Sequence, residues 1–169
     1  MLSKKLNAAL NNQMNKEFFA AYTYLSVAAY FEEQELGGFA NFFKIQSQEE
    51  LQHAMKIFTY LHNVSGEVTL AAISAPKKEF KQPIDAFKFG LKNEQELAGD
   101  IESLLQLAIS EHHAPTQVFL QWFITEQVEE EALFTRYIKR LSLVGSDANG
   151  LLLLDNEFGN RKPDAGEKE

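Results

Sequence analysis

Apolar residues recur at helical spacing along four long segments of the chain. The segments cover residues 3–33, 39–64, 84–111 and 116–144. Within each, apolar side chains return every three or four positions, as on the buried face of an α-helix. Ser3 can cap the first helix, and Pro115 suits the first turn of the fourth. At about 1.5 Å per residue, rods of about 30 residues are roughly 45 Å long.

Two different links join the first three helices. Gly37-Gly38 is a short turn, which makes the first two helices antiparallel neighbours. Residues 65–83 contain one glycine and two prolines and show no helical period. A link of this length is uncommon inside a compact domain, but when extended it can span about 60 Å and return along the second helix. The pattern predicts an all-α, four-helix bundle with one long crossover between helices two and three.

A short fifth helix is predicted after the fourth, capped by Ser146 or Asp147. Residues 151–154 are all leucine, which is too apolar for a short helix surrounded by water. We expect this face to pack between subunits. Residues 1–159 then form a single domain, and residues 160–169 form a loose polar tail.

Each of the four apolar stripes is interrupted near its middle by polar residues. On the third segment the inward stripe reads Ile84, Phe87, Leu91, Glu94, Ala98, Ile101, Leu105 and Ala108. The interruptions, in chain order, are Glu17, Glu50, His53, Glu94, Gln127 and Glu130. Midpoints of packed rods of equal length meet at one height, so we expect one polar layer between apolar layers. Glu50 and His53 are three apart and share a helix face.

A layer of buried carboxylates needs positive charge. Burying an unpaired ionised carboxylate costs several kcal/mol, and clustered carboxylates also repel one another. No lysine or arginine lies on the stripes near this layer, so a pair of bound dications is the simplest counter-charge. Carboxylates with one imidazole suit iron or manganese, and zinc can also bind. The alternative is that one or more of these acids turn out to solvent.

Composition narrows the class of protein. The net charge of −8 argues against nucleic acid as a partner. The chain has no cysteine, which excludes disulfides, thiolate zinc sites and iron–sulfur clusters. The N-terminus lacks the apolar core of a signal peptide, and the longest apolar run, residues 150–154, is too short to span a membrane. We therefore expect a cytoplasmic protein.

Taken in order, Glu17, Glu50-x-x-His53, Glu94 and Gln127-x-x-Glu130 resemble the motifs of the bacterial non-haem ferritins. The resemblance covers essentially the whole chain, including the crossover and the short fifth helix. It implies a ferritin-like fold and ferroxidase activity, in which Fe(II) is oxidised to Fe(III) by dioxygen. It also implies a homo-oligomeric shell of 24 subunits that stores ferric mineral.

The resemblance further implies three iron sites in each subunit. Their ligands are Glu17, Glu50 and His53 at the first site, with Glu50 bridging; Glu50, Glu94 and Glu130 at the second, with Gln127 beside them; and Glu49, Glu126, Glu129 and Glu130 at a third, nearer the inner surface. Tyr24 matches a tyrosine that lies against the di-iron centre. The alternative for Tyr24 is a plain core residue, and for the third set a solvated acidic face.

Related families differ from this chain at identifiable positions. Bacterioferritins and rubrerythrins resemble each other in carrying a second Glu-x-x-His on the fourth helix, where this chain has Glu130 and no histidine. Rubrerythrins also need a cysteine-bound iron. The haem-binding methionine of bacterioferritins follows the glutamate of helix two, and that position here is Leu51. No haem is expected, and nearby Met55 is the alternative haem ligand.

Two other functions are compatible with the same residues. A di-iron peroxidase or oxygenase would need an open pocket beside the metal, and the aromatic stripes leave little room for one. A purely structural bundle would keep the polar layer without metal. His112 and His113 fall between the third and fourth helices, where an exposed pair is expected, with a surface metal contact as the alternative.

Overall fold

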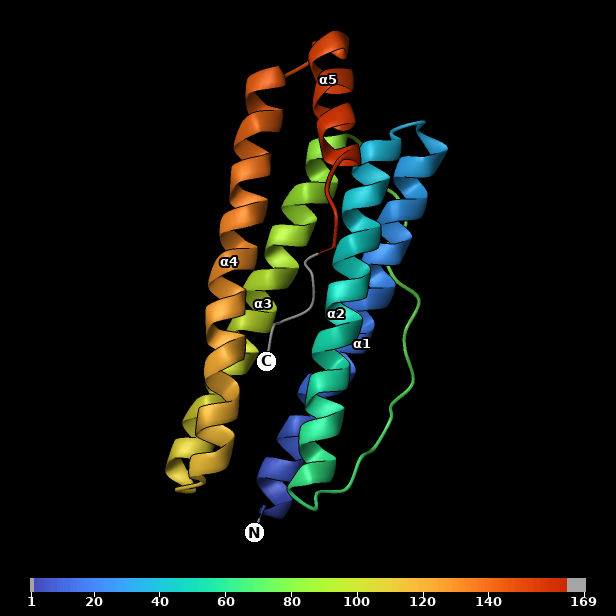
Figure 1. Cartoon of the computed structure of the whole chain (residues 1–169). Helices are drawn as coiled ribbons and strands as arrows, with labels where there is room; N and C mark the ends of the chain where they lie inside the picture. Colours follow the sequence, from blue (N-terminus) through green and yellow to red (C-terminus); the bar gives the residue numbers. More distant parts are fainter. Residues whose placement is uncertain (1, 164–169) are drawn as a thin grey trace.

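The computed structural model describes residues 2–163 (Figure 1). Its helices are α1 (Lys4–Glu33), α2 (Gly37–Asn63), α3 (Pro83–Ser110), α4 (Ala114–Val144) and α5 (Ala148–Gly159). The long helices start and end within two residues of the predicted positions. Within the described residues no segment forms a β-strand. The predicted all-α bundle with a short fifth helix is confirmed.

The helices are connected in the order that the length of the link between the second and third helices predicted. α1 packs on α2, α3 packs on α4, and α1 also contacts α3. Residues 64–82 form the crossover from α2 to α3. In Figure 1 this crossover runs the length of the bundle beside α1 and α2, so that α3 begins at the end where α2 begins. Among the described helices, none is both long and apolar enough to cross a membrane.

Two apolar clusters fill the bundle, one toward each end. The cluster near α5 is rich in aromatic rings, including Phe31, Phe42 and Phe87. The cluster at the other end gathers residues of α1 to α4, including Leu10, Ile57 and Phe123. The ring centroids of neighbouring buried residues in the first cluster lie 5.0–6.4 Å apart, and those of Tyr137 and Phe158 lie 4.2 Å apart. These spacings favour edge and tilted contacts. The polar layer lies between these two water-excluding clusters.

The turn between α1 and α2 differs from the prediction. Residues 34–36 make the turn, with Glu35 at φ 57°, and Gly37 is already helical. Gly38 is needed for close packing, because a Cβ there would lie 1.6 Å from the carbonyl oxygen of Asp155 in α5. The Asp155 side chain also accepts a hydrogen bond from the backbone N–H of Phe39 at 2.8 Å. Gly38 therefore lets α5 dock on the start of α2.

Three asparagines of α1 hold the start of the crossover. Asn7, Asn11 and Asn15 are four residues apart, which is about 6 Å along a helix. Each accepts a hydrogen bond from a crossover N–H, in order those of Glu67, Thr69 and Ala71, at 2.9, 2.6 and 2.8 Å. Each also donates to a crossover carbonyl, at 3.2, 2.7 and 2.8 Å. Two extended residues span nearly the same length, so the two repeats match.

α3 is rotated slightly from the predicted stripe. Gly90, Leu97 and Leu104 are buried, whereas Leu91 and Leu105, on the predicted stripe, are only half-buried. A Cβ at Gly90 would lie 2.3 Å from the ring of Phe134 on α4. The glycine lets α4 approach, and this contact sets which face of α3 turns inward.

Two predictions about the ends of α4 and α5 are corrected. His113 is the N-cap of α4, and its Nδ1 lies 2.7 Å from Oγ1 of Thr116. His113 is thus a half-buried helix cap, whereas His112 is exposed as predicted. The leucines of α5 divide: Leu154 is buried in its own subunit, while Leu152 and Leu153 are 54% and 71% exposed. Leu151 is half-buried, so Leu152 and Leu153 are the leucines of this run that are exposed.

The asparagine contacts can be tested by truncation. Asn11→Ala removes three hydrogen bonds of a buried amide, so we expect the free energy of unfolding to fall by about 1–3 kcal/mol. The crossover should also become more open to trypsin at Lys77. Asn12→Ala, on the exposed side of the same helix, is the control and should change stability by less than about 0.5 kcal/mol. Equal behaviour of the two variants would show that the contacts do not hold the crossover.

Candidate metal centre

The six residues that interrupt the stripes are all buried in the layer between the two apolar clusters. Their exposed fractions are 1% for Glu17, 0% for Glu50, 3% for His53, 0% for Glu94, 4% for Gln127 and 4% for Glu130. The alternative in which these acids turn to solvent is therefore wrong. Each long helix contributes at least one of them, as the matching midpoints predicted.

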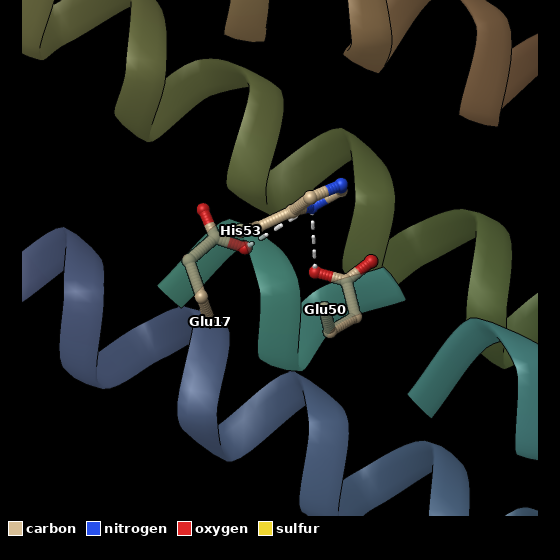
Figure 2. A group of neighbouring side chains, drawn as sticks. All are labelled: Glu17, Glu50 and His53. Carbon is tan, nitrogen blue, oxygen red and sulfur yellow. Dashed lines mark ion pairs between the residues drawn. The ribbon is translucent and has the colours of Figure 1, made fainter. Parts of the chain in front are cut away.

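Glu17, Glu50 and His53 form one group (Figure 2). His53 Nδ1 lies 3.3 Å from Glu50 Oε2, its neighbour on the same face of α2, and 3.9 Å from Glu17 Oε2 across on α1. One ligand atom from each residue lies within 4.8 Å of the others. Among the described residues 2–163, this is the one group of three or more acidic or histidine side chains that is close enough together to hold a metal ion. Two carboxylates and an imidazole are suitable ligands for iron, manganese or zinc.

Glu94 is held by two donors. The hydroxyl of Tyr24 donates to its Oε1, and Gln127 Nε2 donates to its Oε2 at 3.1 Å. Gln127 also donates to the Glu94 backbone carbonyl at 3.1 Å, which fixes the amide. Tyr24 is fully buried. It therefore lies directly against one of the acids of the layer, and is more than filling for the core.

Glu130 is linked to a side chain from the C-terminal segment. Gln46 Nε2 donates to Glu130 Oε2 at 2.8 Å, and Gln46 Oε1 accepts from Arg161 at 2.6 Å. Arg161 also binds both oxygens of Glu49. The prediction of a loose tail is wrong for Arg161, because these contacts hold it; residues 164–169 lie outside the described part.

The acids expected at a third site are placed less uniformly. Glu49 is buried, Glu126 is half-buried and Glu129 is exposed. Glu49 and Glu126 line a common groove between α2 and α4, together with His53. His53 Nε2 lies 4.0 Å from Glu126 Oε1, so the imidazole faces the groove with one nitrogen and the buried carboxylates with the other. Glu129 does not line that groove.

The groove itself was not expected. It has a volume of about 700 Å³, and Trp122 and Lys56 are among the residues that line it. Lys56 Nζ lies 3.8 Å from the centre of the Trp122 ring. The expectation of little room beside the centre is wrong on this side of the bundle. The carboxylates of Glu17, Glu50 and Glu94 do not line the groove.

Burial dominates the electrostatics of the layer. It raises the pKa of Glu17, and burial together with the neighbouring charges of Glu94 and Glu17 raises the pKa of Glu50 well above its usual value. Burial likewise raises the pKa of Glu94 to about 7 and that of Glu130 to about 9. Without a cation, the layer holds protons near neutral pH. A bound cation would displace them.

Glu50 has the strongest need for a cation. It is fully buried, and neither of its oxygens accepts a hydrogen bond from any described residue. Oε2 of Glu17 has none from the described part of the chain either. Buried polar atoms are nearly always paired in native proteins, and an ion is one recognised reason for an exception. The oxygen and nitrogen ligands present fit a hard or borderline dication.

Comparison with known proteins decides the family. Residues 7–144 match the ferritin-like domain family. The chain is 43% identical over 161 residues to a bacterial non-heme ferritin of Staphylococcus aureus (strain MRSA252), covering 95% of this chain and 97% of that protein. The chain belongs to the ferritin family. As the family implies, this ferritin is an iron-storage protein.

Other relatives agree. A non-heme ferritin of Staphylococcus haemolyticus is 42% identical over 164 residues, covering 97% of this chain and 99% of that one. The crystal structure of an open pore ferritin from the archaeon Archaeoglobus fulgidus superposes with a TM-score of 0.95 at 41% identity. That comparison covers 96% of this ferritin and 99% of the archaeal chain.

Sequence reasoning missed three polar partners of the acids. Gln13 Nε2 donates to Glu17 Oε1 at 2.6 Å from one helical turn away, and Gln46 stands one turn before Glu50 on α2. Gln13 could have been found by looking for an amide four residues before a buried acid. Gln46 lies on the inward face of α2, but it donates to Glu130 on α4, a contact that spacing along α2 does not predict. Arg161 carries no such signal, because nothing in a short polar tail shows where it folds.

The raised pKa values make the stability of the metal-free ferritin depend on pH. The usual pKa of Glu94 and Glu130 is 4.5, so from there up to about 7 and about 9 the folded state binds more protons than the unfolded state. The free energy of unfolding then falls as pH rises through this window.

We expect the melting temperature of metal-free protein to fall by about 5 °C or more between pH 6 and pH 9. Differential scanning calorimetry after exhaustive chelation measures it. Glu94→Gln/Glu130→Gln should flatten the dependence, and so should saturating Zn²⁺, which replaces the protons. A melting temperature that stays level or rises in the unmodified metal-free protein would contradict these pKa shifts.

Proposed function

We propose that this ferritin is a ferroxidase that oxidises Fe(II) with dioxygen at two adjacent iron sites inside each subunit. The observation that carries the proposal is the fully buried carboxylate of Glu50, whose two oxygens accept no hydrogen bond from the described residues. His53 Nδ1 lies 3.3 Å from it, and the nearby charges of Glu94, Glu17 and Glu130 all raise its pKa. A carboxylate so placed suits a bridge between two ions.

The first proposed site consists of Glu17, Glu50 and His53. The 3.3 Å and 3.9 Å separations of His53 Nδ1 from the two carboxylates support it, because ligands of one ion lie at such distances from each other. Gln13 holds one oxygen of Glu17 and leaves the other directed to the ion. His53 Nε2 faces Glu126, which supports Glu126 as the group that orients the imidazole.

The second proposed site consists of Glu50, Glu94 and Glu130, with Gln127 beside it. The pKa of Glu130 is raised in part by the charge of Glu94, which indicates that these acids are close. Tyr24 and Gln127 fix the orientation of Glu94 by donating to its two oxygens. We assign Tyr24 to positioning Glu94 and to the layer that lies against the reacting irons.

The charge of the layer favours oxidation. Each Fe(II) gives one electron and dioxygen accepts both, so positive charge increases at the two sites. Carboxylates bind the harder and more highly charged Fe(III) better than Fe(II). Filling the sites also displaces the protons that burial holds on Glu50, Glu94 and Glu130. Ferric ions then leave for the mineral in the shell.

We further propose the third, weaker site on the groove side of the centre. Glu49 and Glu126 line the groove, and Glu130 is near enough to Glu49 for that charge to raise its pKa. Glu129 is exposed and would have to turn toward the groove to take part. This site shares only Glu130 with the buried di-iron centre, so it should bind iron less tightly than the other two sites.

The catalytic proposal is tested by removing one ligand from each site. His53→Ala and Glu94→Ala should each lower the initial rate of Fe(II) oxidation by about 100-fold or more, because even the supporting partners of a metal ligand are worth about 10–100-fold. The assay is the aerobic increase in Fe(III) absorbance with purified apoprotein. Glu102→Ala removes an exposed acid of α3 and should react like the unmodified protein. Wild-type rates in either ligand variant would exclude this centre.

We also propose that the subunits assemble as a shell of 24 in the cytoplasm. The support is the family and the two exposed leucines of α5, Leu152 and Leu153. The chain has no cysteine for use in an oxidising compartment.

The assembly proposal predicts the effect of charge on α5. Each leucine buried between subunits contributes about 1.5–3 kcal/mol, repeated at every equivalent contact, so Leu152→Glu/Leu153→Glu should break the shell into small species. Asn149→Glu/Asn156→Glu adds the same charge to other exposed positions of α5 and should leave it whole. Sedimentation velocity separates the outcomes. An intact large particle in the leucine variant would mean that α5 is not an assembly element.

A further inference from the structure

Arg161 is held in a defined place just after α5. Asn41 Nδ2 donates to the backbone carbonyls of Phe158 and Arg161, at 3.2 and 3.1 Å. These bonds turn the chain back onto α2. The guanidinium then lies over the ring of Phe42, 4.7 Å from its centre. Backbone and ring together direct the guanidinium toward the polar layer.

The guanidinium uses its donors on two side chains of α2. Nη1 donates to Gln46 Oε1 at 2.6 Å. Nη2 donates to both oxygens of Glu49, at 3.1 and 2.9 Å. The side chains of Arg161 and Glu49 are only 18% and 11% exposed, unlike those of the exposed Arg140–Glu157 pair at 38% and 57%. Solvent screens the Arg161–Glu49 pair less, so the two charges attract each other more strongly than those of the exposed pair.

Glu49 is therefore already occupied by a cation. It is also an acid of the proposed third iron site, and the oxygens that would bind an ion are those that now accept from Arg161. A guanidinium does not lose its proton in proteins, so it can give up Glu49 only by moving away. The short segment after α5 makes such movement possible without disturbing the bundle.

Gln46 connects this pair to the di-iron layer. Its carbonyl oxygen accepts from Arg161 and its amide nitrogen donates to Glu130 Oε2 at 2.8 Å. The guanidinium thus holds Gln46 in the orientation that pairs Glu130. A change from Arg161 to a metal ion at Glu49 would therefore also affect Glu130, an acid of the proposed second iron site, through Gln46.

We propose that Arg161 is a tethered cation that competes with iron for Glu49, so that the third site binds weakly and releases its ion toward the cavity. The inference rests on the proposed third site. It makes Arg161 a positioning residue that acts through Glu49 and Gln46 and touches neither iron of the di-iron centre. If Arg161 only stabilised the fold, its removal would have the opposite effect, because a less ordered third site would bind its ion more weakly.

The test is a gain of affinity. Zn²⁺ titration of the assembled, metal-free full-length protein by isothermal calorimetry should show a weakly bound ion whose binding depends on Glu49. Arg161→Gln should tighten that ion by about tenfold or more, since it no longer displaces hydrogen bonds to a charged group. Arg161→Lys keeps the charge and should restore part of the competition. Arg136→Gln removes the same charge from an exposed position of α4 and should change nothing.

The dependence on Glu49 makes the result specific. In a Glu49→Gln background, Arg161→Gln should have no further effect, because the contested carboxylate is absent. Unchanged or weaker Zn²⁺ binding in Arg161→Gln, an equal gain in the Glu49→Gln background, or no Glu49-dependent ion in either protein would each overturn the inference. Zn²⁺ undergoes no oxidation here, so this outcome is separate from a failure of wild-type Fe(II) oxidation, which would overturn the ferroxidase proposal alone.

Discussion

The cost of burying carboxylates at the middle of the bundle governs the rest of the structure. Glu17, Glu50, Glu94 and Glu130 lie between two apolar clusters that exclude water from both sides. Charge is several kcal/mol less stable there than in solvent, so each acid must be given a donor, a proton or a cation. The lengths of the helices and their shared midpoints matter because they put these acids in one layer. The apolar clusters then supply the stability that the layer lacks.

The hydrogen-bond donors are distributed unequally among the four buried acids. Glu17 and Glu130 each receive a hydrogen bond from one amide, and Glu94 receives one from an amide and one from a hydroxyl. Glu50 receives none from the described residues. The acids that accept these bonds are thereby oriented, whereas Glu50 is left without such a bond within the described part of the chain. Further out, the guanidinium of Arg161 occupies Glu49, an acid that lines the groove between α2 and α4.

Periodicity predicted what is local and repeated. The helices, the layer and the meeting of Glu17 with Glu50 and His53 follow from helical spacing and matched midpoints. The rotation of α3 did not, because it depends on the ring of Phe134 approaching Gly90, a contact between two helices. Arg161 lay further out of reach, since it contacts Gln46 across 115 residues of sequence. The ligand roles themselves stay predictions, since spacing places side chains but does not show what they bind.

The asparagine contacts of α1 also limit how the crossover can change in length. Between residues 67 and 71 a helix repeat of four is matched to an extended repeat of two. Inserting one residue there would turn each following peptide group to the wrong side, and even a two-residue insertion would shift the pairing by a full step. Beyond residue 71, Ser26 donates to the carbonyl of Lys77 and the ring of Phe80 packs against Tyr30, contacts that do not repeat along the chain. Natural length variation among relatives should therefore gather in the second half of the crossover, although both halves lack regular secondary structure.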